Sequence, residues 1–357
     1  MSNDRNHPGG VLLKGSESSL RRGYEKWSNL KIDQDLTETE DAAEASYPSE
    51  VKTIASPVSA TGPGTFFGKS QRTVRFFPGT DHGWWLDRSD LPDCLPTKAS
   101  IYNVWTTGAI VRNIVLRSGP PENYIRMVEH MIALKLGMGL DSLNLQLDSG
   151  DPPLFDDGSL SLVNTFKRAG IQSTGQKAKY FTVKEPVSVA GPNDDFLTVA
   201  PCRAEVPRID IDCAVEFNNA IGQQRIRFPV TTKNFCYGAQ ARTNTTAGKR
   251  MYCRTIGKLF SDIRNLGYTD DNVLVAGKKK YFNEPRLVHE DKSLEVVWHR
   301  AILDLLAAFT LIDGGRFVGE ITAYKGGHQL DIELITQLYL NDLLTEYKPK
   351  DSTESAC

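Results

Sequence analysis

The sequence lacks the features of several large classes of protein. Its six cysteines form no Cys-x-x-Cys pair, so we expect neither a zinc-finger framework nor a secreted disulfide scaffold. No hydrophobic run approaches the ~18 residues of a membrane span. The first residues, Met1–Arg5, do not begin a secretory signal peptide. These absences predict a cytoplasmic protein with no integral membrane segment.

An excess of charge of one sign is also absent. The chain has 42 Lys and Arg residues against 44 Asp and Glu residues, which gives a net charge of −2. A protein that holds nucleic acid through bulk charge would be basic, so we expect no nucleic-acid partner. The 357 residues are 40% hydrophobic and 24% charged. This balance is typical of globular proteins, and the length suffices for two domains.

The two ends of the chain differ from the part between them. Acidic residues dominate residues 31–50, and hydrophobic periodicity is weak there. We therefore expect residues 1–50 to form a mobile acidic extension. Residues 351–357 are expected to form a free tail.

The core between these ends alternates between strand and helix patterns, and a polar, turn-forming stretch at 191–195 marks a boundary within it. We expect an α+β fold of two similar domains, 51–190 and 191–350, each a sheet with helices on one face. Strands are expected at 51–58, 73–77, 143–147, 181–189, 209–217, 224–229 and 317–324, and helices at about 122–136, 160–169, 253–266, 294–311 and 331–344.

Three histidines stand in settings that suit chemistry. Glu129 and His130 are adjacent in a hydrophobic helix, where a carboxylate and an imidazole are costly without partners. A metal ion with a bound water would explain the pair, because histidine can ligate the ion while glutamate takes a proton from the water. A polar helix stripe facing solvent is the alternative.

The second setting is His299 and Asp304, also in a predicted helix. A spacing of i,i+4 would bring two ligands onto one face, whereas this i,i+5 spacing separates them by about 140° on a regular α-helix. Taken alone, the pair is a weak signal.

The third setting is His328, which follows Gly326-Gly327 at the end of a predicted strand. A histidine on such a turn suits a proton donor, and it equally suits an ordinary surface residue.

Five motifs in order give these residues a common context. Residues 53–64 are similar to an opening strand and glycine turn, and Val128–Met131 with Gly137–Leu143 resembles V-E-H-L…G-L-G-I-D-N-L. Residues 154–159 resemble P-I-M-D-G-S, Ala241-Arg242-Thr243 matches A-R-T, and 323–328 resembles A-Y-K-S-G-H. The sequence thereby resembles the UDP-3-O-acyl-N-acetylglucosamine deacetylase family, the zinc amidases of lipid A biosynthesis, from about Thr53 to Tyr347.

The resemblance implies a β-α-α-β sandwich in which the helical layers of two similar domains pack on each other around the active site. It implies hydrolysis of the N-acetyl group of a UDP-linked, 3-O-acylated glucosamine, with release of acetate. Zinc is the implied cofactor, and iron(II) suits the same ligands. The residues that match the family's site are Glu129 as general base, His130, His299 and Asp304 as metal ligands, Thr243 beside the oxyanion, and His328 as its cationic partner and proton donor to the amine.

One departure from the family pattern lies at the ligands themselves. The family has H-K-x-L-D, whereas this chain has His299-Arg300-Ala301-Ile302-Leu303-Asp304, with Arg300 in place of the lysine. We count Arg300 among the catalytic candidates for that reason. An inserted residue, for which Ala301 is the natural candidate, would be absorbed as a π-bulge that returns His299 and Asp304 to one face. The ungapped alternative places Arg300 at the ligand position, where it cannot bind zinc.

Three further departures concern the surroundings of the site. Ala308 stands where the family has an acidic residue that orients the catalytic histidine, Asn244 replaces a phenylalanine, and Phe66 replaces a histidine of the G-L-H-T-G turn. The expected function is the lipid A deacetylase acting as a monomer on UDP-3-O-acyl-N-acetylglucosamine. A diverged zinc amidase for another N-acylated sugar and a non-catalytic relative that binds a sugar nucleotide or a partner are the alternatives.

Overall fold

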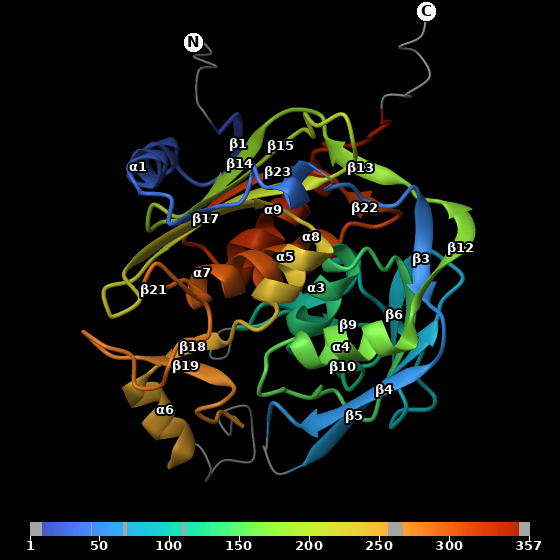
Figure 1. Ribbon diagram of the computed structural model, residues 1–357. Helices are drawn as coiled ribbons and strands as arrows, with labels where there is room; N and C mark the ends of the chain where they lie inside the picture. Colours follow the sequence, from blue (N-terminus) through green and yellow to red (C-terminus); the bar gives the residue numbers. More distant parts are fainter. Residues whose placement is uncertain (1–8, 44, 67–69, 109–111, 256–266, 350–357) are drawn as a thin grey trace, which may run out of the picture.

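The computed structural model describes residues 9–43, 45–66, 70–108, 112–255 and 267–349. Two larger sheets lie on opposite sides of a group of helices (Figure 1). The fold is therefore mixed α+β, as the alternation of patterns predicts.

The larger sheet has seven strands, in the order β1-β14-β15-β23-β16-β17-β2. In β16 the side chains of Ile209, Ile211 and Cys213 are buried, and those of Asp210 and Asp212 alternate with them on the other face, as the period of two in a strand requires. The strands are β1 (Val11–Lys14), β2 (Gln34–Asp35), β14 (Val187–Ala190), β15 (Phe196–Ala200), β16 (Ile209–Glu216), β17 (Gln223–Pro229) and β23 (Gly319–Tyr324).

The second sheet has five strands, in the order β4-β5-β11-β6-β7. Its central strand buries Leu143, Leu145 and Leu147 and exposes Asn144, so one face packs on the helices and the other faces solvent. The strands are β4 (Val58–Pro63), β5 (Gln71–Pro78), β6 (Gly83–Arg88), β7 (Thr97–Lys98) and β11 (Ser142–Leu147).

Short strands connect and border these sheets. They form the pairs β3 (Glu50–Ile54) with β12 (Ile171–Lys177), β18 (Thr243–Thr246) with β19 (Val273–Ala276), and β20 (Val288–His289) with β21 (Lys292–Ser293). They also form the sheets β8 (Val104–Thr106), β9 (Val115–Arg117) and β10 (Tyr124–Ile125), and β13 (Tyr180–Val183), β22 (Arg316–Phe317) and β24 (Leu344–Glu346). A 3₁₀ turn, η1 (Ile101–Asn103), precedes β8.

The helices between the larger sheets carry the candidate site. Helix α3 packs against the segment η3 and α8, and α5 packs against α3 and α7. The elements are α3 (Glu129–Gly137), α4 (Leu160–Ala169), α5 (Thr232–Gly238), α7 (Glu295–His299), the π-helix η3 (Arg300–Leu305), α8 (Leu306–Thr310) and α9 (His328–Leu340), and elsewhere α1 (Glu17–Ser28), α2 (Glu40–Ala43) and α6 (Ala247–Arg254).

The helices expected at 160–169 and 294–311 are confirmed almost to the residue. The helix expected from residue 122 begins only at Glu129, because Tyr124 and Ile125 pair with β9 as a strand. Residues 256–266 of the helix expected at 253–266 lie outside the described residues.

One buried arginine, Arg316 of β22, links its short sheet to the segments at which β11 and β3 begin. The Arg316 side chain is fully buried and donates to both carboxylate oxygens of Asp141, at the start of β11. It also donates to the backbone carbonyls of Pro48 and Glu50. Because a guanidinium presents several donors in one plane, a single side chain fixes three segments relative to one another.

Residues 1–50 were expected to form a mobile acidic extension, but residues 9–43 of this segment are part of the fold. Strands β1 and β2 form the two edges of the seven-stranded sheet. Helix α1 covers the outer face of that sheet through Leu20 and Tyr24, and the Tyr24 ring stacks on Phe196 at a centroid distance of 4.1 Å.

The acidic composition of this segment wrongly predicted a mobile extension, because the basic partners of its carboxylates lie far along the chain. Asp33 pairs with Lys292 at 2.7 Å, Asp35 pairs with Arg227 at 3.3 Å, and Asp41 pairs with Lys233. A count of local charge therefore cannot distinguish a solvated segment from one that is neutralised by the sheet beneath it.

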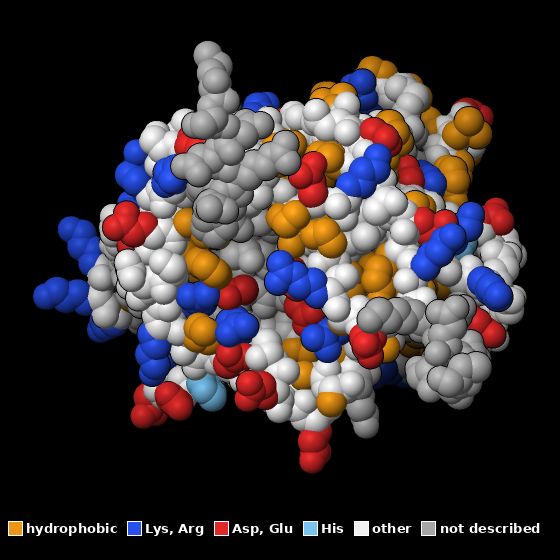
Figure 2. Space-filling view, turned by 90° about the horizontal axis from the view of Figure 1, so that it is seen from above, with side chains coloured by type: hydrophobic (Ala, Val, Ile, Leu, Met, Phe, Trp, Pro, Cys, Tyr) orange, Lys and Arg blue, Asp and Glu red, His pale blue; other side chains and the backbone are white. Residues whose placement is uncertain are grey.

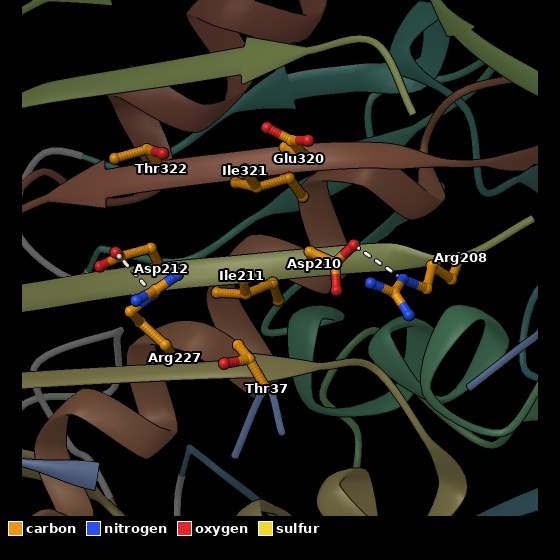
Figure 3. Close-up of a pocket in the computed structure, with 9 residues that line it drawn as sticks. All are labelled: Thr37, Arg208, Asp210, Ile211, Asp212, Arg227, Glu320, Ile321 and Thr322. Carbon is orange, nitrogen blue, oxygen red and sulfur yellow. Dashed lines mark hydrogen bonds and ion pairs between the residues drawn. The ribbon is translucent and has the colours of Figure 1, made fainter. Parts of the chain in front are cut away.

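The outer face of the same sheet holds a polar cavity of about 330 Å³ (Figure 3). Within it Arg208 pairs with Asp210, and Arg227 pairs with Asp212. Seen from the side of α1, basic and acidic side chains lie interspersed over the surface (Figure 2). Because its charges already have partners, this cavity is a weaker candidate for a site than the buried histidines. Among the described residues, no helix has the length and apolarity to span a membrane.

A substitution tests whether the amino-terminal helix contributes to stability. Leu20 is 1% exposed, so Leu20→Ala should lower the free energy of unfolding by about 2–5 kcal/mol, as measured by urea denaturation. Leu95→Ala, at a side chain that is 82% exposed, is the control and should change it little. Equal stability of the two variants would contradict the docking of α1.

Candidate functional site

Helix α3 places Glu129 and His130 at its first turn. The Glu129 side chain is buried, and its Oε2 accepts a hydrogen bond of 3.1 Å from the Ile114 backbone N–H. The Ser159 hydroxyl donates to the His130 carbonyl at 2.8 Å. The turn at 154–159, one of the five motifs, thus anchors the start of the helix that carries the carboxylate and the imidazole.

The predicted π-bulge is present as the π-helix η3, which spans Arg300–Leu305 between α7 and α8. The wider turn brings His299 Nδ1 to 3.5 Å from Asp304 Oδ1. The His299 ring also lies 5.4 Å from the His130 ring, between centroids. The inserted residue is therefore absorbed within the helix, and the histidine and the aspartate share one face.

His328 meets the same group from a third direction, as the first residue of α9. Its Nε2 lies 3.7 Å from Glu129 Oε1 and 3.6 Å from Asp304 Oδ1. Three helical elements thus bring their polar side chains to one buried place, and the first of them lies about 170 to 200 residues before the other two along the chain.

Burial and neighbouring charge set the protonation of these side chains. Burial raises the pKa of Glu129, although His328 acts in the opposite direction. Burial lowers the pKa of His130 to about 3 and also lowers that of His299, which favours the neutral imidazole that binds metals. Burial also disfavours the charged form of His328, but the carboxylates of Asp304 and Glu129 outweigh it and raise the pKa.

Several buried polar atoms in this cluster have no hydrogen-bond partner among the described residues. They include His130 Nδ1, His299 Nε2 and Asp304 Oδ1. Burying a polar atom without a hydrogen-bond partner costs free energy. A bound cation would remove this cost, because imidazole nitrogens and carboxylate oxygens are ligands for metal ions. Within the described ranges no three such side chains stand in a preformed coordination geometry. The residues fit a metal ion by chemistry, burial and unsatisfied lone pairs.

Thr243 has no described contact with this cluster. It begins β18, is partly buried, and pairs along its backbone with Val273. No described hydrogen bond or ion pair joins its side chain to the histidines or carboxylates.

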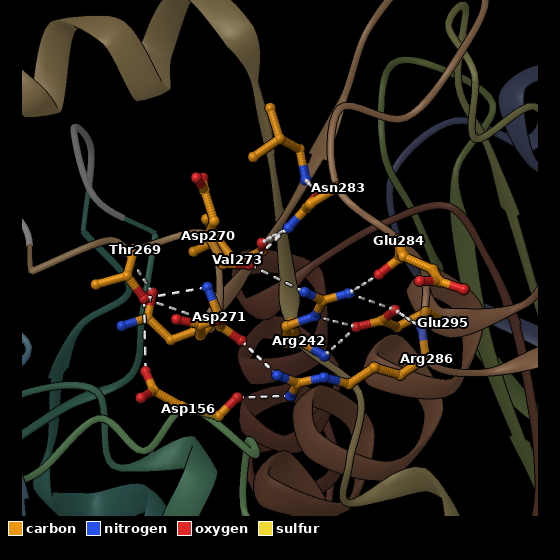
Figure 4. A network of polar contacts seen from close by, with 12 residues as sticks. Asp156, Arg242, Thr269, Asp270, Asp271, Val273, Asn283, Glu284, Arg286 and Glu295 are labelled. Atoms are coloured by element: carbon orange, nitrogen blue, oxygen red, sulfur yellow. Dashed lines mark hydrogen bonds and ion pairs between the residues drawn. The ribbon is translucent and has the colours of Figure 1, made fainter.

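The residue before it, Arg242, ties β18 to helix α7 (Figure 4). Its guanidinium and backbone N–H donate to Glu295, the first residue of α7, at 2.7–3.1 Å. Both side chains are nearly inaccessible. The A-R-T motif therefore supports the helix that carries His299.

Arg300, one of the expected catalytic residues, forms a buried ion pair with Asp331. Its side chain is 6% exposed and forms a two-point ion pair with Asp331, whose side chain is fully buried. It also approaches Asp304 Oδ2 at 3.9 Å. Sequence reasoning missed Asp331, because an acid in the first turn of a helix is commonly a surface residue that complements the helix dipole.

The other departures from the family pattern have structural correlates. Ala308 is buried among hydrophobic side chains, and His328 Nδ1 has no partner in the described part of the chain. Phe66 is 1% exposed and packs with Met127 against Tyr252 and Tyr268. A hydrophobic cluster thus occupies the position of the family histidine.

A substitution tests the support of α7. Removing one partner of a buried ion pair leaves the other charge uncompensated. Arg242→Met should therefore lower the free energy of unfolding by about 3–5 kcal/mol, as measured by urea denaturation. Arg21→Met, in a pair with Glu17 that is more than half exposed, should cost at most about 1 kcal/mol. Similar losses in the two variants would contradict the role given to the buried pair.

Comparison with known proteins places the chain in a family. Residues 51–340 match the LpxC family, described as UDP-3-O-acyl N-acetylglycosamine deacetylase. A UDP-3-O-acyl-N-acetylglucosamine deacetylase of Nautilia profundicola is 29% identical over 290 residues, which are 80% of this chain and 91% of that protein. Its counterpart in Brucella ovis is 26% identical over 299 residues, 83% of this chain and 97% of that protein. This chain belongs to the LpxC family.

Proposed function

We propose that the protein removes the N-acetyl group of UDP-3-O-acyl-N-acetylglucosamine, releasing acetate and the free amine, in lipid A biosynthesis. The observation that supports this most directly is the convergence of Glu129, His299, Asp304 and His328 at 3.5–3.7 Å in a buried place. All the residues that perform amide hydrolysis in this proposal lie within residues 51–340, which match the family. A division into two domains is part of the same proposal. The two larger sheets on either side of the helices support it, although β14 (Val187–Ala190) pairs with β15 and so goes with the second half.

His130, His299 and Asp304 would hold a metal ion, zinc or iron(II). The donor set of two imidazoles and a carboxylate leaves a position for water and substrate, as in catalytic zinc sites. Such an ion, when bound, polarises a carbonyl and lowers the pKa of water. The unpaired buried nitrogen atoms of His130 and His299 support this assignment.

Glu129 and His328 would handle the protons on either side of the scissile bond. Glu129 accepts a proton from the water that adds to the carbonyl carbon, and burial raises the pKa of this carboxyl, which makes it a stronger base. His328, cationic between two carboxylates, stabilises the negative charge that develops on the carbonyl oxygen and gives its proton to the amine as the C–N bond breaks. Thr243 would contribute beside that oxygen.

The general-base assignment has a direct test. Glu129→Ala should abolish acetate release from UDP-3-O-acyl-N-acetylglucosamine while leaving the metal content unchanged, because the carboxylate moves a proton and does not ligate. Acetate is quantified enzymatically and metal by mass spectrometry. Parallel loss of metal and activity would contradict the assignment.

The ligand assignment predicts a different pattern. His299→Ala should lower zinc affinity steeply, with loss of activity as a consequence, because it removes one of three protein ligands. His289→Ala, at a partly exposed histidine outside the cluster, should retain wild-type zinc content in equilibrium dialysis. Zinc retained equally by the two variants would rule out His299 as a ligand.

Burial of Phe66 supports a second candidate, an amidase for another N-acylated sugar nucleotide. A hydrophobic cluster replaces a polar group that the family uses toward substrate, and loss of a hydrogen-bonding group changes which substrate is accepted. A zinc-replete protein that ignores the 3-O-acylated UDP sugar but cleaves another N-acetyl sugar nucleotide would establish this candidate. Bound zinc without turnover of either would leave a non-catalytic binding protein.

A further inference from the structure

The ion pair of Arg300 and Asp331 supplies neither a metal ligand nor a transferred proton in the proposed function, although Arg300 also lies 3.9 Å from Asp304 Oδ2. Both Nη atoms of Arg300 contact the two carboxylate oxygens of Asp331, at 2.5 and 2.6 Å. Arg300 follows His299 in the chain, and Asp331 lies one helical turn after His328. The pair thus joins the segment that carries two proposed ligands to the helix that begins with the proposed proton donor.

The same guanidinium holds the turn before His328. Lys325 and Gly326 both have left-handed backbone conformations, with φ of 56° and 68°, and such a conformation is unfavourable for lysine. Arg300 Nε donates to the Lys325 carbonyl at 3.3 Å. On the other side of the residue, the Lys325 N–H donates to Ala214 at 2.8 Å, and its Nζ pairs with Glu216 at 2.9 Å.

Apart from the approach of its Nε2 to Glu129 and Asp304, the His328 ring has little else to set its position. Its Nδ1 has no hydrogen-bond partner among the described residues, and the helix position from which the family presents a carboxylate is Ala308. The placement of the ring therefore depends on the backbone of the turn and of the first turn of α9, and Arg300 contacts both.

We propose that Arg300 and Asp331 are positioning residues that hold His328 at its working distance from Glu129 and Asp304, in place of the acid missing at Ala308. This inference rests on the proposed function of His328. Replacing a buried ion pair by hydrophobic residues of similar volume is often neutral for stability. The pair is therefore best explained by the geometry it imposes, which a planar two-point fork defines closely.

Three variants separate positioning from stability. Asp331→Asn and Arg300→Lys each weaken the fork, and the double variant Arg300→Met/Asp331→Leu removes both charges and leaves neither unpaired. The control is Asp212→Asn, which disturbs the buried ion pair with Arg225 on the outer sheet face, away from the site. Each protein is measured for kcat, KM, zinc content and melting temperature.

The proposal predicts that kcat falls by about 10- to 100-fold in the three variants, the usual effect of losing a group that orients a site residue. KM and zinc content should change far less. The double variant should regain the melting temperature but not kcat, and Asp212→Asn should keep wild-type kcat. Wild-type kcat in a stably folded double variant would overturn the proposal, and so would a loss of zinc that matches the loss of activity.

A readout without turnover keeps this test independent of the proposed function. The rate at which diethyl pyrocarbonate modifies His328, followed by peptide mass spectrometry, reports how the ring is held. It should rise in the double variant relative to the wild type, because the ring is only 10% exposed when held, and stay constant in Asp212→Asn. An unchanged rate would overturn the positioning role. A wild-type protein that releases no acetate, but whose double variant shows the faster modification, would overturn the proposed function alone.

Discussion

One extra residue in the helix from Glu295 to Thr310 is the constraint on which the candidate site depends. In a regular α-helix His299 and Asp304 would face about 140° apart, whereas the π-helix brings them to 3.5 Å. A π-turn is rare because it packs less favourably than an α-turn, so its surroundings must accommodate it. Gly238 of α5 does so, because a Cβ there would lie 2.5 Å from the Ile302 side chain.

Three buried arginine–carboxylate pairs hold the segments around this turn. Arg242 with Glu295 joins β18 to α7, Arg300 with Asp331 joins the π-helix to α9, and Arg316 with Asp141 joins β22 to the start of β11. In each pair the arginine also donates to backbone carbonyls. Such pairs add little net stability over hydrophobic packing, but they fix orientation. A site assembled from distant segments needs that orientation more than it needs further stability.

The sequence was informative where the pattern is local. Hydrophobic periodicity located the helices at 160–169 and 294–311. The π-turn was predicted by comparing the His299–Asp304 spacing with the shorter H-K-x-L-D pattern of the family. The predictions from sequence failed where the interacting residues are far apart along the chain. The amino-terminal segment looked unstructured because its contacts are few and its carboxylates pair with residues such as Lys292, 259 positions away. The pair of Arg300 with Asp331 was missed for the same reason, since the two residues are 31 positions apart and Asp331 lies in none of the motifs.

The departures from the family pattern are not spread evenly over the site. The groups proposed to bind the metal ion or to move protons are all present and lie close together, whereas Thr243 has no described side-chain contact with them. The departures that the resemblance indicates at Phe66 and Ala308 fall outside that set, because both side chains are buried among hydrophobic residues. Hydrolysis of an amide demands a fixed set of charges around the reacting atoms, whereas the wall is determined by the rest of the substrate, and support can be supplied by any rigid neighbour. This distribution argues for retained amide chemistry with altered recognition, and it makes substrate identity a separate question from whether the bond is cleaved.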